Sequence, residues 1–225
     1  MASWSWFLAC GGAPEVVEPP RAEAPPEAKG TAEPEPPVQS VPRVVFLGDS
    51  LTAGYTLEEA EAFPAQVEIL LEEAGFDLEV VNAGVSGDTS AGGLRRLSWL
   101  LRQDPDLLVV ELGANDGLRG LPLESTEENL RQIVEEAQGA GARVLLLGMM
   151  IPPNYGPDYS RGFADLFPRL AEEKGVGLVP FLLEGVAGDP ELNLPDGIHP
   201  TAEGHARVAE TLLPYLKEAL SELSM

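Results

Sequence analysis

The sequence predicts an α/β protein with three layers, an α/β/α sandwich in which helices cover both faces of a five-stranded parallel sheet. Two observations support this prediction. From Arg43 onward, short runs of four or five residues that are almost wholly apolar alternate with longer amphipathic segments. Such runs are typical of strands buried on both faces, as in parallel sheets. Because strand and helix alternate, the connections should be crossovers that place helices on both sides of the sheet.

Five strands and five helices are expected in order along the chain. The strands are Val44 to Leu47, Leu78 to Val81, Leu107 to Val110, Val144 to Leu147 and Gly177 to Phe181. The helices are stretches in which Leu, Ile, Val or Phe recur at three- and four-residue spacing: Phe63 to Ala74, Ser90 to Arg102, Thr126 to Gln138, Phe163 to Lys174 and Thr201 to Leu220. Glycine directly follows Ala74 and Lys174, as is typical of helix ends.

The N-terminal part of the chain has a different composition from the rest, so we assign residues 43–225 to the folded domain. Residues 11–42 are rich in Pro, Glu and Ala, which predicts a disordered, extended linker. Residues 1–10 are apolar and end in Ala9-Cys10, as in the lipidation site of a bacterial lipoprotein signal. This interpretation predicts a secreted or periplasmic protein tethered to a membrane through Cys10. The alternative is a frayed tail with an incidental thiol on a cytoplasmic protein.

The charge of the chain excludes several classes of partner. Lys and Arg number 14 against 37 Asp and Glu, for a formal net charge of −23. A protein that binds nucleic acid or an anionic bilayer needs a basic face, so neither is expected as a direct partner. The single cysteine and two histidines argue against a metal centre, and we expect no cofactor. We expect a monomer whose partner is a small-molecule substrate.

Polar and small residues follow the expected strands and converge on one edge of the sheet. They are Gly48-Asp49-Ser50, Asn82-Ala83-Gly84, Gly113-Ala114-Asn115-Asp116 and, before the last helix, Asp196-Gly197-Ile198-His199. In this architecture chemistry takes place beyond the carboxyl ends of the strands. A serine nucleophile needs a base and a group that orients the base. We therefore expect Ser50 to be the nucleophile, His199 the base and Asp196 the orienting carboxylate.

Three donors in these segments predict an oxyanion hole. The backbone N–H of Ser50 lies at a strand-to-helix turn, where the helix dipole favours an anion. Gly84 offers a second backbone N–H with no side chain in the way, and Asn115 offers a side-chain amide. Asp116 is expected to cap a turn, and Asp49 is expected either to cap its turn or to support the serine turn from behind. His205 is expected to be a surface or packing residue.

Two long loops beyond the same edge carry apolar side chains and predict an acyl-binding groove. They span residues 118–123 and 149–159. Loops of this length at a sheet edge are usually functional. The residues expected to contact the substrate are Leu118, Leu121, Ile151 and Tyr155.

These segments resemble the SGNH, or GDSL, hydrolase family. Gly-Asp-Ser-Leu, Asn-x-Gly, Gly-x-Asn-Asp and Asp-x-x-His occur in family order, each after the expected strand, from about Arg43 to Leu220. Within the family, three stretches resemble the bacterial multifunctional thioesterase, lysophospholipase and arylesterase branch: residues 46–55, 113–120 and 151–159. The resemblance implies a flavodoxin-like fold and the roles above for Ser50, Gly84, Asn115, Asp196 and His199.

We therefore expect a serine esterase that hydrolyses carboxylic esters or thioesters through an acyl-enzyme. A carbohydrate acetylesterase on the same fold and a non-catalytic tethered binding domain are the alternatives. An α/β-hydrolase is disfavoured because Thr52 breaks the Gly-x-Ser-x-Gly pattern. A dinucleotide binder is disfavoured because Asp49 lies where a phosphate-binding loop would be.

Overall fold

The computed structural model describes residues 41–224. The predictions for residues 1–10 and for almost all of the linker at 11–42 lie outside the described residues.

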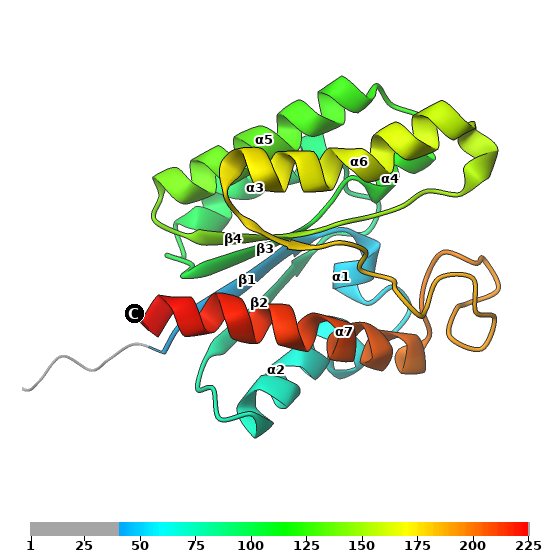
Figure 1. Cartoon of the computed structure of the whole chain (residues 1–225). Helices are drawn as coiled ribbons and strands as arrows, with labels where there is room; N and C mark the ends of the chain where they lie inside the picture. The colour runs from blue at the N-terminus through cyan, green and yellow to red at the C-terminus, as the bar shows by residue number, and fades with distance from the viewer. Residues whose placement is uncertain (1–40, 225) are drawn as a thin grey trace, which may run out of the picture. The chain divides into compact units, whose positions relative to one another are not determined.

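The sheet has five parallel strands in the order β2-β1-β3-β4-β5, which confirms the predicted fold class (Figure 1). The strands are β1 (Arg43–Gly48), β2 (Glu79–Gly84), β3 (Leu107–Glu111), β4 (Arg143–Leu147) and β5 (Gly177–Val179). β1 lies inside the sheet, β2 is added on one side of it, and β3, β4 and β5 are then added in turn on the other side. The topological switch point therefore lies between β1 and β3, where ligands of such sheets usually bind.

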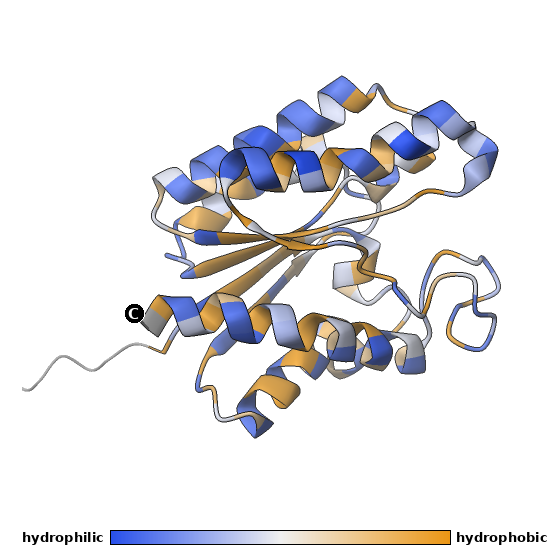
Figure 2. Ribbon diagram, viewed as in Figure 1, coloured by the Kyte–Doolittle hydropathy of each residue, from blue (hydrophilic) through white to orange (hydrophobic). Residues whose placement is uncertain are grey.

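Helices cover both faces of the sheet. On one face α2 (Phe63–Glu73) packs against α7 (Ala202–Ser221), and on the other α5 (Leu123–Gly139) packs between α3 (Ser90–Leu101) and α6 (Pro157–Lys174) (Figure 1). The long helices α5, α6 and α7 each bury apolar residues, and hydrophobic and hydrophilic stretches alternate along their ribbons (Figure 2). In α5 the buried apolar residues recur at helical spacing as Leu130, Ile133, Val134 and Ala137.

The structure differs from the sequence prediction mainly at the carboxyl edge of the sheet. Two short helices, α1 (Ser50–Ala53) and α4 (Ala114–Leu118), and the 3₁₀ turn Glu59–Glu61 lie in segments for which no complete element was predicted. The 3₁₀ turn Pro153–Tyr155 lies in a segment predicted as a loop, and a further 3₁₀ turn, Glu222–Ser224, follows α7. Four or five residues are too few to show a helical period, so no pattern could predict them. Within residues 41–224, no helix is both long and apolar enough to cross a membrane.

Candidate active site

The candidate site lies at the carboxyl edge of the sheet, at the switch point between β1 and β3. Ser50 is the first residue of α1, directly after the turn that ends β1, and Asn115 lies in α4 after β3. His199 and Asp196 come from the loop that precedes α7. The chain thus brings residues 149 positions apart to one edge.

Ser50, His199 and Asp196 form a continuous hydrogen-bonded chain. The Nε2 atom of His199 lies 3.0 Å from the Oγ of Ser50, and its Nδ1 lies 2.8 Å from Oδ2 of Asp196. Asp196 can hold the tautomer in which Nδ1 carries the proton, which leaves Nε2 free to accept one from Ser50. The three residues predicted from the sequence therefore have the geometry of a nucleophile, a base and an orienting carboxylate.

The second oxygen of Asp196 fixes the loop itself. Its Oδ1 accepts hydrogen bonds from the backbone N–H groups of Ile198 (2.9 Å) and His199 (3.0 Å). The backbone N–H and the ring of His199, followed by the N–H of Ile198, lower the pKa of Asp196 to about 2. The carboxylate is therefore ionised throughout the range in which an imidazole titrates. Deeper in the same loop, the buried Asn193 donates to the carbonyl oxygens of Val186 and Asp189.

Two of the three predicted oxyanion donors are available. Ser50 is the first residue of α1, and within residues 41–224 its backbone N–H has no acceptor. The amide of Asn115 donates one hydrogen to Oδ2 of Asp49 at 2.8 Å, which orients the side chain and leaves its second hydrogen free. These two donors lie in the short helices that follow β1 and β3, the strands on either side of the switch point.

The prediction for Gly84 is not supported by its geometry. Its N–H donates to the side-chain Oδ1 of Asn82 at 3.0 Å, so this donor is already used. Gly84 is the last residue of β2, and a Cβ there would lie 2.2 Å from the backbone nitrogen of Ala53. The position needs glycine because α1 packs directly on the strand end.

The next glycine in the same loop has the free donor. Val85 to Asp88 form a turn in which the Asp88 N–H donates to the Val85 carbonyl, and Gly87 has the positive φ of 80° that the third position of a type II turn requires. Within residues 41–224 the N–H groups of Ser86 and Gly87 have no acceptor. The pair Gly87-Asp88 is a sequence signal for this turn, because glycine and aspartate are frequent in turns. The signal was missed because the predicted strand ended at Val81, whereas β2 extends to Gly84.

An arginine that the sequence did not single out fastens this loop to the sheet. Arg96 of α3 donates to the carbonyl oxygens of Ala83 (2.6 Å) and Gly48 (2.9 Å), at the ends of β2 and β1. Its Nε is paired with Asp88 at 2.8 Å. Arg96 is one of two adjacent arginines on an amphipathic helix, and such residues resemble any solvated charge, so no sequence pattern distinguishes it.

Both histidines and Asp116 make contacts that fix nearby elements. The ring of Tyr55, which is half exposed, lies 4.4 Å from the ring of His199, centroid to centroid. His205 is buried, and its Nδ1 accepts the N–H of Phe63 at the start of α2, so it is a packing residue that caps a helix. Asp116 likewise accepts from the N–H and Oγ of Ser90, at the start of α3.

The predicted acyl-binding loops lie against each other. The hydroxyl of Tyr155 donates to the carbonyl of Leu118 at 2.8 Å, and that of Tyr159 donates to the carbonyl of Leu121 at 2.6 Å. Leu121 and Tyr155 are exposed and Leu118 is half buried. Ile151 is 9% exposed and packs on Gly117 of α4, so it lies beneath these side chains rather than among them.

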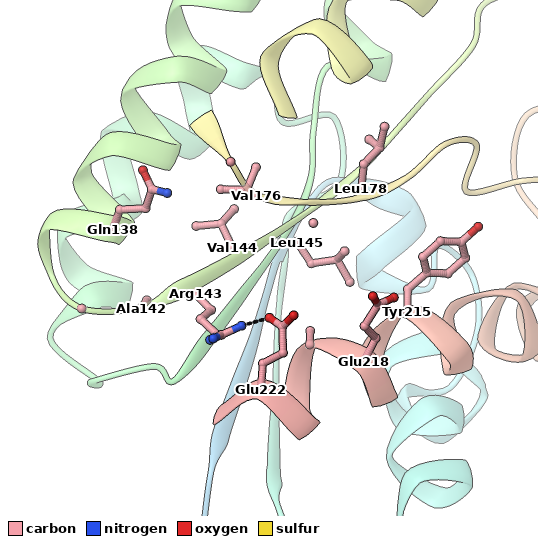
Figure 3. A pocket seen from close by; sticks show the side chains of 14 residues that line it. Gln138, Ala142, Arg143, Val144, Leu145, Val176, Leu178, Tyr215, Glu218 and Glu222 are labelled. Atoms are coloured by element: carbon pink, nitrogen blue, oxygen red, sulfur yellow. Dashed lines mark hydrogen bonds and ion pairs between the residues drawn. The ribbon is translucent and has the colours of Figure 1, made fainter. Parts of the chain in front are cut away.

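A hollow of about 700 Å³ lies at the other end of the strands (Figure 3). It is lined by Arg143 and Gly177, the first residues of β4 and β5, and by Tyr215 and Glu222 at the C-terminal end of the chain. None of the candidate catalytic residues lines it. Because a substrate must reach Ser50, this hollow is not the candidate active site in spite of its size.

The family comparison points to ester hydrolysis. Residues 46–207 match the model of the GDSL-like lipase/acylhydrolase family. The esterase TesA of Pseudomonas aeruginosa is 43% identical over 178 residues, which are 79% of this chain and 89% of that protein. The thioesterase 1/protease 1/lysophospholipase L1 of Escherichia coli K12 is 42% identical over 77% of this chain and 83% of its own length.

Solved structures agree with the fold. The crystal structure of TesA is similar with a TM-score of 0.76, and the match covers 79% of this chain and 99% of that one. The psychrotrophic esterase EstA from Pseudoalteromonas, in a structure inhibited by monoethylphosphonate, is 36% identical with the same TM-score, over 80% and 98% of the two chains.

Proposed function

Because the chain belongs to the GDSL-like lipase/acylhydrolase family, it is a serine hydrolase that acts on ester bonds, and we propose that it does so through an acyl-enzyme formed at Ser50. The observation that carries this proposal is the unbroken chain from Ser50 through His199 to Asp196, with distances of 3.0 and 2.8 Å. A nucleophile, a base and a group that orients the base are what such catalysis requires.

The proposed reaction has two halves. His199 Nε2 takes the proton of Ser50 as Oγ attacks the carbonyl carbon of an ester or thioester. The imidazolium, held by ionised Asp196, returns this proton to the leaving alkoxide or thiolate, and a water molecule activated by His199 then releases the acid. The N–H of Ser50, the free amide hydrogen of Asn115 and the N–H of Gly87 are proposed to stabilise the oxyanion.

The decisive test replaces the nucleophile. Ser50→Ala should abolish hydrolysis of p-nitrophenyl esters and labelling by a fluorophosphonate, while the unfolding transition is retained. Ser125→Ala, which changes an exposed serine of α5, is the matched control and should keep both. His199→Ala should lose a similar factor, because the two residues act as one unit. Full activity of Ser50→Ala would refute the mechanism.

A second test concerns the oxyanion donor. Asn115→Ala removes one donor, so kcat should fall by about 10²–10³ with little change in KM. Steady-state kinetics on one ester measure both constants. A large rise in KM with kcat intact would instead make Asn115 a substrate-binding residue.

The substrate we propose is a carboxylic ester or thioester of a medium or long acyl chain. Two features support this: the exposed apolar side chains of Leu121 and Tyr155, and the mutual contact of their loops. Relatives named arylesterase and thioesterase/lysophospholipase are consistent with it. We expect kcat/KM for p-nitrophenyl octanoate to exceed that for the acetate. The opposite order, with activity on acetylated sugars, would favour a carbohydrate acetylesterase.

We further propose that the protein is exported and anchored through Cys10, and that it is a monomer. The support is the apolar stretch ending in Ala9-Cys10 and the Pro-rich segment after it. Cell fractionation and the intact mass of the purified protein test the anchor, and light scattering tests the monomer. A cytoplasmic protein with an unmodified Cys10 would refute the anchor and leave the esterase proposal intact.

A further inference from the structure

Two carboxyl side chains are buried together directly behind the candidate oxyanion hole. Asp49, in the turn between β1 and α1, is 1% exposed, and Glu111, the last residue of β3, is fully buried. The backbone N–H of Asp49 donates to the carboxyl group of Glu111 at 3.1 Å, so the two residues are in direct contact, and each carboxyl group affects the pKa of the other. Burying two carboxylates side by side is strongly unfavourable unless one of them carries a proton.

The hydrogen bonds of Glu111 favour placing that proton on its own carboxyl group. Its Oε2 accepts from the N–H of Asp49 (3.1 Å) and from the hydroxyl of Thr52 (2.9 Å). Its Oε1 is buried, and among residues 41–224 no donor reaches it. An ionised Glu111 would leave this oxygen without a partner, which is costly. A protonated Glu111 turns Oε1 into an O–H donor, with the Asp49 carboxylate as its acceptor.

The hydrogen bonds of Asp49 are those of an ionised carboxylate. Its Oδ1 accepts from the N–H of Leu51 (3.0 Å), and its Oδ2 accepts from the amide of Asn115 (2.8 Å). Burial, with the charge of Asp49 as a further cause, raises the pKa of Glu111 well above its usual range. Burial also raises the pKa of Asp49, but the donors on it oppose this shift. The contacts therefore favour Glu111 over Asp49 as the carboxyl group that carries the proton.

The charged groups around the pair do not offer Glu111 another partner. From α3, Arg96 reaches the carbonyl of Gly48, but its charge is paired with Asp88. From the loop before α7, the charge of His199 lowers the pKa of Asp49 and not that of Glu111. Thr52 of α1 is neutral. Within residues 41–224, no cation is hydrogen-bonded to Glu111.

We propose that Glu111 is a positioning residue that stays protonated at neutral pH and donates this proton to Asp49, which in turn holds the Asn115 amide in the oxyanion hole. The proposal rests on the role proposed above for Asn115. The proton has a second effect, because it removes one negative charge from behind the place where the oxyanion develops. Two ionised carboxylates there would oppose that charge at short range and low dielectric.

The protonation state can be measured without any assay of activity. In the infrared difference spectrum of the wild-type protein minus Glu111→Gln at pH 7, we expect the carbonyl stretching band of a protonated carboxylic acid. Solvent-exposed carboxyls are ionised at this pH and do not contribute. Glu128→Gln, which changes an exposed glutamate on α5, is the matched control and should give no such band. Absence of the band in the Glu111 difference spectrum would overturn the proposal.

Kinetics test whether Glu111 acts through Asn115. Glu111→Gln keeps a neutral donor and an acceptor in the same shape and should retain most of kcat, whereas Glu111→Met lacks both. We expect Glu111→Met to lower kcat by about tenfold to a hundredfold at nearly constant KM, the range of coupling within one hydrogen-bond network. In the Asn115→Ala background the same change should cost much less. Equal losses in both backgrounds would overturn the positioning role.

These measurements separate the two proposals. If Asn115→Ala changes KM and not kcat, the proposed oxyanion role fails, while the infrared band still reports on the proton of Glu111. If Glu111→Met does not fold, the ratio of Glu111→Gln to wild type and the infrared band decide the matter. A loss in Glu111→Gln as severe as in Asn115→Ala would show that the ionised form is required, and would overturn the proposal.

Discussion

At the scale of single residues, Gly48 makes room for the groups that support the nucleophile. It ends β1 and pairs with Glu111 across the sheet. A Cβ at this position would lie 1.9 Å from Oγ1 of Thr52 and 2.7 Å from Oε2 of Glu111. The hydrogen bond between these two side chains therefore occupies the space that any other residue at 48 would need.

We predict that Gly48→Ala lowers both stability and kcat. Overpacking of this kind costs about 1–3 kcal/mol, and the displaced Thr52 and Glu111 would disturb Asp49 and Asn115. Urea unfolding and ester hydrolysis measure the two effects. The matched control is Gly139→Ala in α5, where a Cβ would meet nothing within 4 Å. It should leave kcat unchanged, and a comparable loss there would contradict the argument.

The sequence predicted the candidate catalytic residues, but it missed most of the groups that hold them in place. Ser50, Asp196 and His199 follow strands or precede a helix, so strand order alone brings them to one edge. Glu111 reads as the polar end of an apolar strand, and no spacing rule reveals that its side chain faces Asp49. Gly84 was predicted as a donor, and Gly87 was not considered, because the apolar pattern of β2 ends before the strand itself, which extends to Gly84.

At the scale of elements, α7 is connected to α2 through a histidine. The N-cap residue of α2, Ala62, provides no side-chain cap, and the first N–H of the helix, that of Phe63, is accepted by Nδ1 of His205 at 3.1 Å. Its ring also stacks on that of Phe63. His205, six positions after His199, thus joins the two helices that cover one face of the sheet.

This contact predicts a pH-dependent stability. Burial, and secondarily the charge of His199, lowers the pKa of His205 from 6.5 to about 4. Between pH 6.5 and about 4, His205 binds a proton in the unfolded chain but stays neutral in the folded chain. The contribution of neutral His205 to the free energy of unfolding is therefore complete above pH 6.5 and is lost as the pH falls towards 4. The loss is about 3 kcal/mol at most. Urea unfolding at pH 7, 6 and 5 of wild type and His205→Gln measures it.

The variant isolates the histidine because glutamine offers an acceptor to Phe63 without titrating in this range. The stability difference between wild type and His205→Gln should shift against the wild type as the pH falls. The exposed Asp196 and the other carboxylates are common to both proteins and cancel. A difference that is constant between pH 7 and pH 5 would mean that His205 is not held neutral by the fold.

At the scale of the whole molecule, the elements predicted with the least error are those buried on the sheet. The cores of all five strands and of the five long helices follow from periodicity, because burial imposes the pattern. The ends of the elements at the carboxyl edge do not follow from periodicity, because the contacts there are local and specific. For example, α1 packs on Gly84. Helix α6 begins at Pro157, six residues before its first fully buried side chain, Phe163.

The acidity of the molecule gives a last prediction, about substrate charge. The formal charge is −23, and the acidic residues Glu58, Glu59 and Glu61 lie between Tyr55, which contacts His199, and the start of α2. A coenzyme A thioester carries phosphates and is repelled by this surface, whereas a neutral p-nitrophenyl ester is not. Salt screens such repulsion, with a Debye length of about 30 Å at 0.01 M and about 10 Å at 0.1 M.

We therefore expect kcat/KM for octanoyl-coenzyme A to rise between 0.01 and about 0.3 M salt, while that for p-nitrophenyl octanoate stays nearly constant. The effect should lie mainly in KM, because repulsion acts on encounter before the acyl group reaches Ser50. Replacing Glu58, Glu59 and Glu61 together by Gln should flatten the dependence for the thioester and leave the neutral ester unchanged, since none of the three contacts the catalytic residues. Identical salt profiles for the two substrates would mean that the charge lies too far from the entrance to act, and that the acidity of the domain serves solubility rather than selection.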